Sequence, residues 1–318
     1  MKVLANDGID AAGKKILEDA GFEVFTEKIP QSELKDKIAA YDILVVRSAT
    51  KVTAEILDAG NLKLVARAGV GLDNIDMKHA GIKHIPVVNT PNASSRSVAE
   101  LVFAHIFSCY RYLHMTNRIM PEQGIERFNE LKKIAGSGLE VQGKTLGVIG
   151  FGRIGQEVAR MGLALGMEIM AHDYLNRDVD LTISFHRNYG KNNFSVTLPG
   201  HKLEDVLQRA DIISIHTPGS TELIGESEFA KMKQGSVLIN CARGGVVNEN
   251  ALLNALKTGK LSFAGIDVFE NEPPVSDELL KLPNVSLSPH IGASTAEAQE
   301  RVGIELANRI TGFFSSRR

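Results

Sequence analysis

The feature that most constrains the fold is a glycine-rich loop, Gly150-Phe151-Gly152-Arg153-Ile154-Gly155, between an apolar strand and a helical stretch. The strand is predicted at Leu146–Ile149 and the helix at Arg153–Leu165. In such loops the first glycine permits a tight turn, the second lets backbone approach a phosphate, and the third lets the helix pack closely on the strand. The free N–H groups at the start of the helix favour bound anions. This arrangement is typical of doubly wound α/β folds.

An acidic residue downstream makes the loop a predicted dinucleotide site. Asp173 ends the next predicted strand, 23 positions after Gly150. An offset of about 20 is expected for the carboxylate that holds the ribose hydroxyls. Because an ionised carboxylate repels a 2′-phosphate, the sequence favours NAD over NADP. A plain strand–turn–helix without a ligand remains the alternative.

Short apolar strands alternate with helical stretches in two parts of the chain, which predicts two α/β units with parallel sheets. Strands of the first unit are expected at Val3–Ala5, Phe22–Phe25, Ile43–Val46, Leu64–Ala66 and Ile85–Val88, with helices at Ala11–Ala20, Gln31–Ala39 and Thr53–Ala59. Strands of the second are expected at Leu146–Ile149, Glu168–Ala171, Ile212–Ile215, Val237–Asn240, Phe263–Ile266 and Val285–Ser288. Two longer helices are expected, at Ser97 to about Met115 and at Ser294–Phe313.

Length and composition narrow the classes of function. A chain of 318 residues suits two domains, and its net charge of -2 argues against a basic nucleic-acid binder. No apolar run approaches the roughly 20 residues of a membrane span, and the N-terminus has no signal-peptide core. The two cysteines, Cys109 and Cys241, form no disulfide framework and no metal-binding cluster. We therefore expect a cytoplasmic protein that takes a small molecule, with no metal, nucleic-acid or membrane partner.

Residues that could bind a ligand or take part in a reaction follow the predicted strands of the second unit. They lie at the sheet edge where doubly wound folds bind ligands. They are His216-Thr217-Pro218, Cys241-Ala242-Arg243, Asp267, Glu272, and His290 with Gly292 and Ala293. Oxidation of an alcohol by NAD needs a base for the hydroxyl proton, a cation for a carboxylate, and a carboxylate that orients the base. His290, Arg243 and Glu272 fit these roles. Spacing alone does not bring them together, and each could instead be structural.

Over nearly its whole length, the chain resembles the D-isomer-specific 2-hydroxyacid dehydrogenases, most closely the branch that acts on 3-phosphoglycerate. Besides the glycine loop, the resemblance is carried by Val46–Thr50, Arg67–Asp76, Asn89–Asn92, Asn240–Gly245, Asp267–Pro273 and Pro289–Thr295. It implies a Rossmann NAD-binding domain at residues 92–286, inserted into a flavodoxin-like substrate domain at 1–91 and 287–318. Both domains are expected to be doubly wound.

The resemblance also implies the residues of the site. The implied catalytic residues are Arg243, Glu272 and His290. Cofactor contacts are expected at Gly150, Gly152, Arg153, Ile154, Gly155, Asp173, His216, Thr217, Pro218, Cys241, Ala242, Arg243, Asp267, His290, Gly292 and Ala293. Substrate contacts are expected at Arg47, Ser48, Arg67, Gly69, Val70 and Gly71. Val70 stands where the family often has threonine, so only its backbone could serve.

Arg47 and Arg67 favour a phosphorylated substrate, because forked guanidinium groups bind a phosphate dianion well. Alternatively, Arg47 and Arg67 are solvated surface charges with no role in substrate binding. The implied reaction is oxidation of D-3-phosphoglycerate to 3-phosphohydroxypyruvate, the first step of serine biosynthesis, with His290 as base. A glyoxylate, hydroxypyruvate or D-lactate type of dehydrogenase and a non-catalytic NAD sensor are the rivals.

Three further expectations follow from the resemblance. The family is typically dimeric through the cofactor domain, and the apolar stripe of Ser97–Met115 suits either that interface or a buried core. Because the sequence ends at Arg318, we expect no C-terminal regulatory domain. The connection 175–202 is about a dozen residues longer than usual and shows no clear period; we expect a β-ribbon or flap beside the adenosine, or a tolerated surface insertion.

Overall fold

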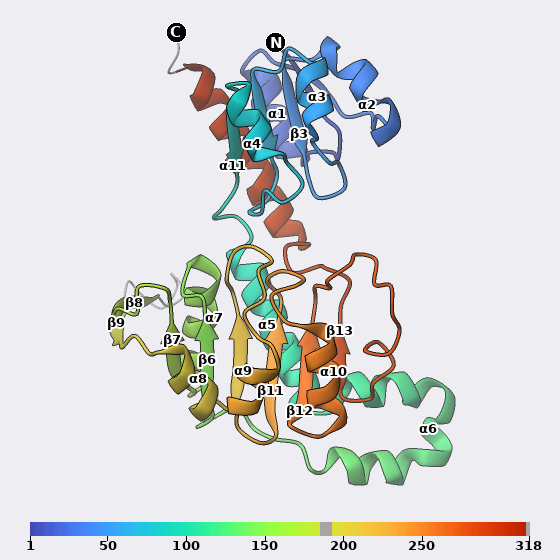
Figure 1. The fold of residues 1–318 in the computed structure, drawn as a ribbon, viewed down its shortest axis with the longest axis vertical. Coiled ribbons are helices and arrows are strands. Elements are labelled where there is room, and N and C mark those ends of the chain that lie inside the picture. The colour runs from blue at the N-terminus through green and yellow to red at the C-terminus, as the bar shows by residue number, and fades with distance from the viewer. Residues whose placement is uncertain (185–192, 316–318) are drawn as a thin grey trace. The chain divides into compact units, whose positions relative to one another are not determined.

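The computed structural model describes residues 1–184 and 193–315 and divides the chain into two compact units (Figure 1). The first unit comprises residues 1–97 together with those from Ala293 onward, and the second unit comprises residues 98–292. The domain limits predicted from the sequence, 91/92 and 286/287, lie a few residues before these divisions.

The first unit is built on a parallel five-stranded sheet whose order is β2-β1-β3-β4-β5. The strands are β1 (Lys2–Ala5), β2 (Glu23–Phe25), β3 (Ile43–Val46), β4 (Leu64–Arg67) and β5 (Val87–Asn89). This is the flavodoxin-like order of the doubly wound sheets. β5 begins later than predicted, because Pro86 has no N–H to give to the ladder.

Helices cover both faces of this sheet, and two apolar clusters fill the space between. They are α1 (Ala11–Asp19), α2 (Gln31–Lys37), the 3₁₀ turn η1 (Ile38–Ala40), α3 (Ala54–Ala59), α4 (Met77–Ile82) and α11 (Ala296–Ser315). The closing helix α11 lies against α1, and a Cβ added at Gly13 would sit 2.5 Å from the carbonyl oxygen of Gly303. This close crossing joins the end of the chain to its beginning.

The second unit has a parallel six-stranded sheet of order β13-β12-β11-β10-β6-β7. Its strands are β6 (Thr145–Ile149), β7 (Glu168–His172), β10 (Ile212–Ile215), β11 (Ser236–Asn240), β12 (Leu261–Ile266) and β13 (Val285–Leu287). Its helices are α5 (Ser95–Tyr110), α6 (Leu113–Ala135), α7 (Arg153–Ala164), α8 (Leu203–Arg209), α9 (Glu226–Lys231) and α10 (Glu249–Lys257). The strand order reverses at β6, where Rossmann folds bind dinucleotides. The two sheets confirm the predicted fold class.

The predicted helix from Ser97 to Met115 is wrong at its end. α5 stops at Tyr110, Tyr112 adopts a left-handed φ of 55°, and α6 starts at Leu113. α6 was not predicted from the sequence, because this helix has little apolar periodicity and buries only Gly124 and Leu131. The apolar stripe of α5 is part of the core: Val102, Ile106 and Cys109 are fully buried.

The long connection after Asp173 forms the predicted β-ribbon in its described part. β8 (Val179–Ser184) and β9 (Asn193–Leu198) pair antiparallel, and residues 185–192 lie outside the described residues. The expectation of no clear period was wrong, because alternate side chains face the protein and Leu181 and Leu198 are buried. The connection meets β7 through a parallel bridge between Ala171 and Gly200 and a hydrogen bond from the His201 N–H to the Ala171 oxygen, and so covers that edge strand.

Candidate active site

The glycine loop has the geometry that its three glycines predict. Gly150 turns the chain at φ 92°, and a Cβ there would lie 2.6 Å from the carbonyl carbon of His216 at the end of β10. A Cβ at Gly155 would lie 2.2 Å from the oxygen of Gly150, so only glycine lets α7 approach this closely. An added Cβ at Gly152 would meet no described atom within 4 Å. Space for a ligand therefore adjoins the backbone of Gly152.

Asp173 follows β7 and is held against this loop. Its Oδ2 accepts a hydrogen bond from the Phe151 N–H at 3.0 Å. Gly152 precedes α7 without a side-chain cap from any described residue, and Arg153 is exposed in the first turn while Ile154 packs inward. Open backbone, an uncapped helix start and a carboxylate after the next strand fit the pyrophosphate and ribose of NAD.

His216 follows β10 and lies beside the glycine loop, but it is the backbone of His216 that adjoins Gly150. Its N–H donates to the Ile149 oxygen at 2.7 Å, and its Nε2 lies 2.8 Å from Ser214 Oγ. Burial lowers the pKa of His216 to about 3, so its ring is neutral at physiological pH. Thr217 is partly buried and Pro218 is exposed. His216 is therefore unsuited to act as a general base near neutral pH.

The turn after β11 is organised by Asn240. Its Oδ1 accepts the Ala242 N–H at 3.1 Å, and its Nδ2 donates to the Arg243 oxygen at 3.1 Å. The guanidinium of Arg243 is partly buried and donates to the Ala242 oxygen at 2.6 Å. Burial raises the pKa of the Cys241 thiol well above its usual range, which disfavours the thiolate and a role as nucleophile.

His290 and Glu272, predicted as base and orienting carboxylate, are brought together. His290 Nδ1 and Glu272 Oε2 are 2.7 Å apart, and the side chains keep 44% and 38% of their exposure. The other oxygen of Glu272 accepts the Phe269 N–H at 3.3 Å. With Nδ1 bound to a carboxylate, Nε2 is the nitrogen that can take a proton from a ligand, and the carboxylate then stabilises the imidazolium.

A buried carboxylate holds the backbone around His290. Asp267 is 1% exposed; its carbonyl oxygen accepts the His290 N–H, and its Oδ1 and Oδ2 accept the N–H groups of Ile291 and Gly292, each at 2.9 Å. His290 adopts a left-handed φ of 54°, which is costly for a residue other than glycine. Asp267, predicted as a cofactor contact, thus has both oxygens bonded to this loop.

In the first unit, Arg47 follows β3 and Arg67 is the last residue of β4. The Arg47 N–H donates to Asp7 Oδ2 at 2.8 Å, and its guanidinium bonds to Gln299 Oε1. Arg67 donates from Nη1 to the Ala68 oxygen at 3.1 Å, and its guanidinium lies directly against Gly69. A Cβ at Gly69 would overlap Arg67 Nη1, so the guanidinium can lie there only because this residue is glycine.

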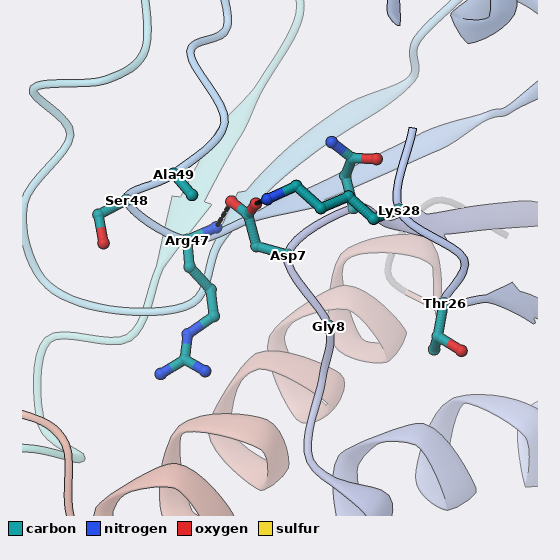
Figure 2. Close-up of a pocket in the computed structure, with 8 residues that line it drawn as sticks. Asp7, Gly8, Thr26, Lys28, Arg47, Ser48 and Ala49 are labelled. Atoms are coloured by element: carbon teal, nitrogen blue, oxygen red, sulfur yellow. Dashed lines mark hydrogen bonds and ion pairs between the residues drawn. The ribbon is translucent and has the colours of Figure 1, made fainter. Parts of the chain in front are cut away.

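A cavity of about 360 Å³ lies at the carboxyl ends of β1 and β3, entirely within the first unit (Figure 2). Its lining residues are Asn6, Asp7, Gly8, Thr26, Lys28, Arg47, Ser48 and Ala49. The Lys28 amine points to Asp7, with its Nζ 3.8 Å from Asp7 Oδ1. Asp7 and Lys28 were not predicted as site residues, although both lie just after predicted strands, which was the available signal.

The remaining predicted substrate residues are Ser48, Val70 and Gly71. Ser48 is exposed on the cavity rim, Gly71 follows Val70, and the Val70 oxygen accepts a bond from Asn89 Nδ2 at 2.7 Å.

Within residues 1–184 and 193–315, no group of three or more His, Cys, Asp or Glu side chains is placed to hold a metal. In the same residues, no helix combines the length and apolarity of a membrane span.

Comparison with known proteins places the chain in a family. Residues 103–292 match the D-isomer specific 2-hydroxyacid dehydrogenase, NAD binding domain. The chain is 44% identical to a hydroxypyruvate reductase of Thermotoga maritima, with 97% of each chain covered. It is 41% identical to a D-3-phosphoglycerate dehydrogenase of Methanocaldococcus jannaschii, over 98% of this chain and 57% of that protein.

A solved structure of a related enzyme has the same fold as this chain. The NAD⁺-bound 3-phosphoglycerate dehydrogenase of Entamoeba histolytica is 27% identical and superposes with a TM-score of 0.78, covering 100% of this chain and 96% of that one. Fold, glycine loop and family match together define an NAD-dependent dehydrogenase. The chain belongs to the D-isomer specific 2-hydroxyacid dehydrogenases. It spans little more than half of the phosphoglycerate dehydrogenase from Methanocaldococcus jannaschii.

Proposed function

We propose that this enzyme oxidises D-3-phosphoglycerate to 3-phosphohydroxypyruvate. The observation that carries the choice of substrate is the cavity of about 360 Å³ in the first unit, lined by Lys28 and Arg47. A phosphate dianion needs cationic donors, and guanidinium groups bind it by paired hydrogen bonds. Asp7 offsets part of this charge, but its carboxylate is already bonded to the N–H groups of Arg47 and Thr50. With two cations and one carboxylate, the lining keeps a net positive charge for an anionic ligand.

The chemistry is assigned to the second unit. His290 Nε2 accepts the proton of the substrate hydroxyl, and Glu272 at Nδ1 stabilises the imidazolium. The Arg243 guanidinium binds the substrate carboxylate. NAD, when bound along Gly150–Gly155 with its ribose at Asp173, supplies the acceptor for the hydride from C2. Arg67 is a second candidate for the phosphate.

Reduction of unphosphorylated hydroxypyruvate is the second candidate function. It is favoured by the relative from Thermotoga maritima, named hydroxypyruvate reductase, because that protein and this chain cover 97% of each other. For such a substrate the Lys28–Arg47 cavity would add nothing to binding. The two candidates therefore differ in a measurable preference for the phosphate group.

A substrate panel tests the proposal. Purified enzyme is assayed with NADH on 3-phosphohydroxypyruvate, hydroxypyruvate and glyoxylate, and with NAD on D-3-phosphoglycerate and D-glycerate. We expect kcat/KM for each phosphorylated compound to exceed that of its unphosphorylated partner by about tenfold or more, the value of one or two charged hydrogen bonds. Equal values, or a preference for hydroxypyruvate, contradict the proposal and support the reductase. Repeating the panel with NADP tests the assignment to Asp173.

The enzyme is further proposed to be a cytoplasmic homodimer that serves serine biosynthesis. Support for the dimer comes from α6 rather than α5: Ile125 is 98% exposed and Phe128 is 54% exposed on this helix. Exposed apolar side chains grouped on one element are typical of an interface between subunits. Sedimentation equilibrium at micromolar concentration would show a monomer mass if this is incorrect.

A further inference from the structure

A chain of buried hydrogen bonds leads from α5 to the loop of His290, and it lies wholly in the second unit. His105 on α5 is 4% exposed, and its Nε2 is 2.9 Å from Ser288 Oγ. Ser288 Oγ donates to Asp267 Oδ1 at 2.6 Å, a short bond to a buried carboxylate. The same carboxylate accepts the N–H groups of the two residues that follow His290. His105 is thus two hydrogen bonds from the carboxylate that anchors His290.

The direction of each bond in this chain is determined. Because Ser288 gives its only proton to Asp267, it must accept from His105, which therefore carries a proton on Nε2. The other ring nitrogen of His105, Nδ1, then accepts from Ser286 Oγ at 2.9 Å. Burial lowers the pKa of His105, although the charge of Asp267 acts in the opposite direction, so the ring stays neutral. One tautomer of a neutral ring satisfies every member of the network.

The sheet makes room for this imidazole. A Cβ added at Gly265 on β12 would lie 2.6 Å from the Cβ of His105, so the ring fits only because that position is glycine. Two neighbours of His105 on α5, Val102 and Ile106, are apolar and fully buried. A polar side chain in such a place costs free energy unless its hydrogen bonds are made. An apolar residue would fill this position without that requirement.

We infer that His105 is a positioning residue for the reaction: through Ser288 and Asp267 it fixes the strained backbone of His290, so that Nε2 of His290 meets the substrate hydroxyl. The inference rests on the proposed role of His290 as base. As long as His105 donates to the oxygen of Ser288, the Ser288 hydroxyl gives its proton to Asp267. Asp267 then keeps three donors in fixed positions, and the left-handed conformation of His290 is maintained.

Two matched substitutions of His105 test this. A glutamine amide reaches the position of the imidazole Nε2, so His105→Gln keeps the bond to Ser288. An asparagine amide reaches the position of Nδ1, so His105→Asn keeps the bond to Ser286 and loses Ser288. Misplacing a reacting group by about 1 Å costs up to about 100-fold. We expect His105→Asn to lower kcat about tenfold to 100-fold with KM changed less than about threefold, and His105→Gln to stay near the wild-type kcat.

A coupling measurement makes the test independent of stability. In a Ser288→Ala background the link to Asp267 is already cut, so His105→Asn should lower kcat no further. Equal kcat for the Asn and Gln variants, or an undiminished effect of His105→Asn in the Ser288→Ala background, would overturn the inference. His290→Asn is assayed alongside: a near-normal kcat for that variant overturns the proposed base, whereas an inactive His290→Asn with an unaffected His105→Asn overturns the positioning role alone.

Discussion

In each unit of this enzyme, a loop that carries a proposed functional residue is anchored on an aspartate with a buried side chain. In the second unit Asp267 accepts two backbone N–H groups and the Ser288 hydroxyl. In the first unit Asp7 accepts the N–H groups of Arg47 and Thr50 and the Thr50 hydroxyl, at 2.8, 3.0 and 2.8 Å. Both carboxylates follow parallel strands, and both have three donors. The same arrangement thus serves a loop with a proposed base and a loop with a proposed phosphate ligand.

The surroundings of the two aspartates differ. Asp267 is backed by the interior, through Ser288 and His105, and it holds His290 at a left-handed φ of 54°. Asp7 borders a cavity, and its neighbour Lys28 keeps 63% of its side-chain exposure. We therefore expect rigidity to matter at the loop of the proposed base, and charge and access to matter at the loop of the proposed phosphate ligand. This difference can be tested by substitution.

The largest effect is expected from the base itself. In His290→Asn the loop keeps its bonds to Asp267, but no group accepts the hydroxyl proton, so kcat should fall about 1000-fold or more. Binding of NADH, followed by its fluorescence, should stay within about threefold of wild type. Glu272→Gln, which keeps a hydrogen bond but loses the charge, is the milder control. A His290→Asn enzyme that retains a tenth of its kcat would remove His290 from the mechanism.

A matched pair of substitutions compares the two anchors directly. In Asp267→Asn and Asp7→Asn an amide group faces N–H donors, and each change should cost about 1–3 kcal/mol of unfolding free energy. Asp267→Asn should also lower kcat about 100-fold on phosphorylated and unphosphorylated substrates alike. Asp7→Asn should mainly raise KM for the phosphorylated substrate. Denaturation curves measure the loss of stability, and kinetics on both substrates measure the changes in kcat and KM. Identical kinetic profiles for Asp267→Asn and Asp7→Asn would contradict the division of roles.

Much of this arrangement could be predicted from the sequence, because strand ends are visible as apolar runs that stop. Predicted strands are followed by glycine at positions 150, 152 and 155 and by Asp173, Arg243 and His290. A parallel sheet brings the carboxyl ends of its strands to one edge. The pairing of His290 with Glu272 could only be expected from the family resemblance. Their contact at 2.7 Å depends on how the chain between them folds.

The parts that escaped prediction depend on three-dimensional packing. His105 looks like one more member of an apolar helix face, and its partners are about 180 positions away in the chain. α6 was missed because its polar surface has no apolar period, whereas a ribbon was expected in the connection 175–202 but its strands were not located from the sequence. Propensity and spacing report local structure, whereas these features depend on non-local contacts.

A smaller effect is expected from the cations of the first unit. Arg47→Ala removes a forked donor, so kcat/KM for D-3-phosphoglycerate should fall about tenfold to 100-fold, while that for D-glycerate changes less than about twofold. Lys28→Ala should act in the same direction but more weakly, because its amine is a solvated point charge. Lys35→Ala on α2, also exposed but outside the cavity, is the control. Equal losses on both substrates would assign Arg47 a structural role.

The smallest effect on activity, and a distinct one on stability, concerns acid. The buried, neutral histidines His105 and His216 both lie in the second unit, so the comparison predicts that this unit is the acid-sensitive one. His216 has a pKa of about 3 when folded and an ordinary value near 6.5 when unfolded. Between these values the unfolded chain binds more protons, so stability is complete above about pH 6.5 and declines as the pH falls toward 3.

His216→Gln, which can keep the bond to Ser214, should therefore lose about 2 kcal/mol less unfolding free energy than wild type between pH 7 and pH 5. Urea unfolding at the two pH values measures this. The same substitution at His84, an exposed residue of the first unit, serves as the control and should leave the acid response of the second unit unchanged. If His216→Gln loses as much stability on acidification as wild type, other buried groups account for the acid response. The His105→Gln enzyme from the positioning test would then be measured in the same way.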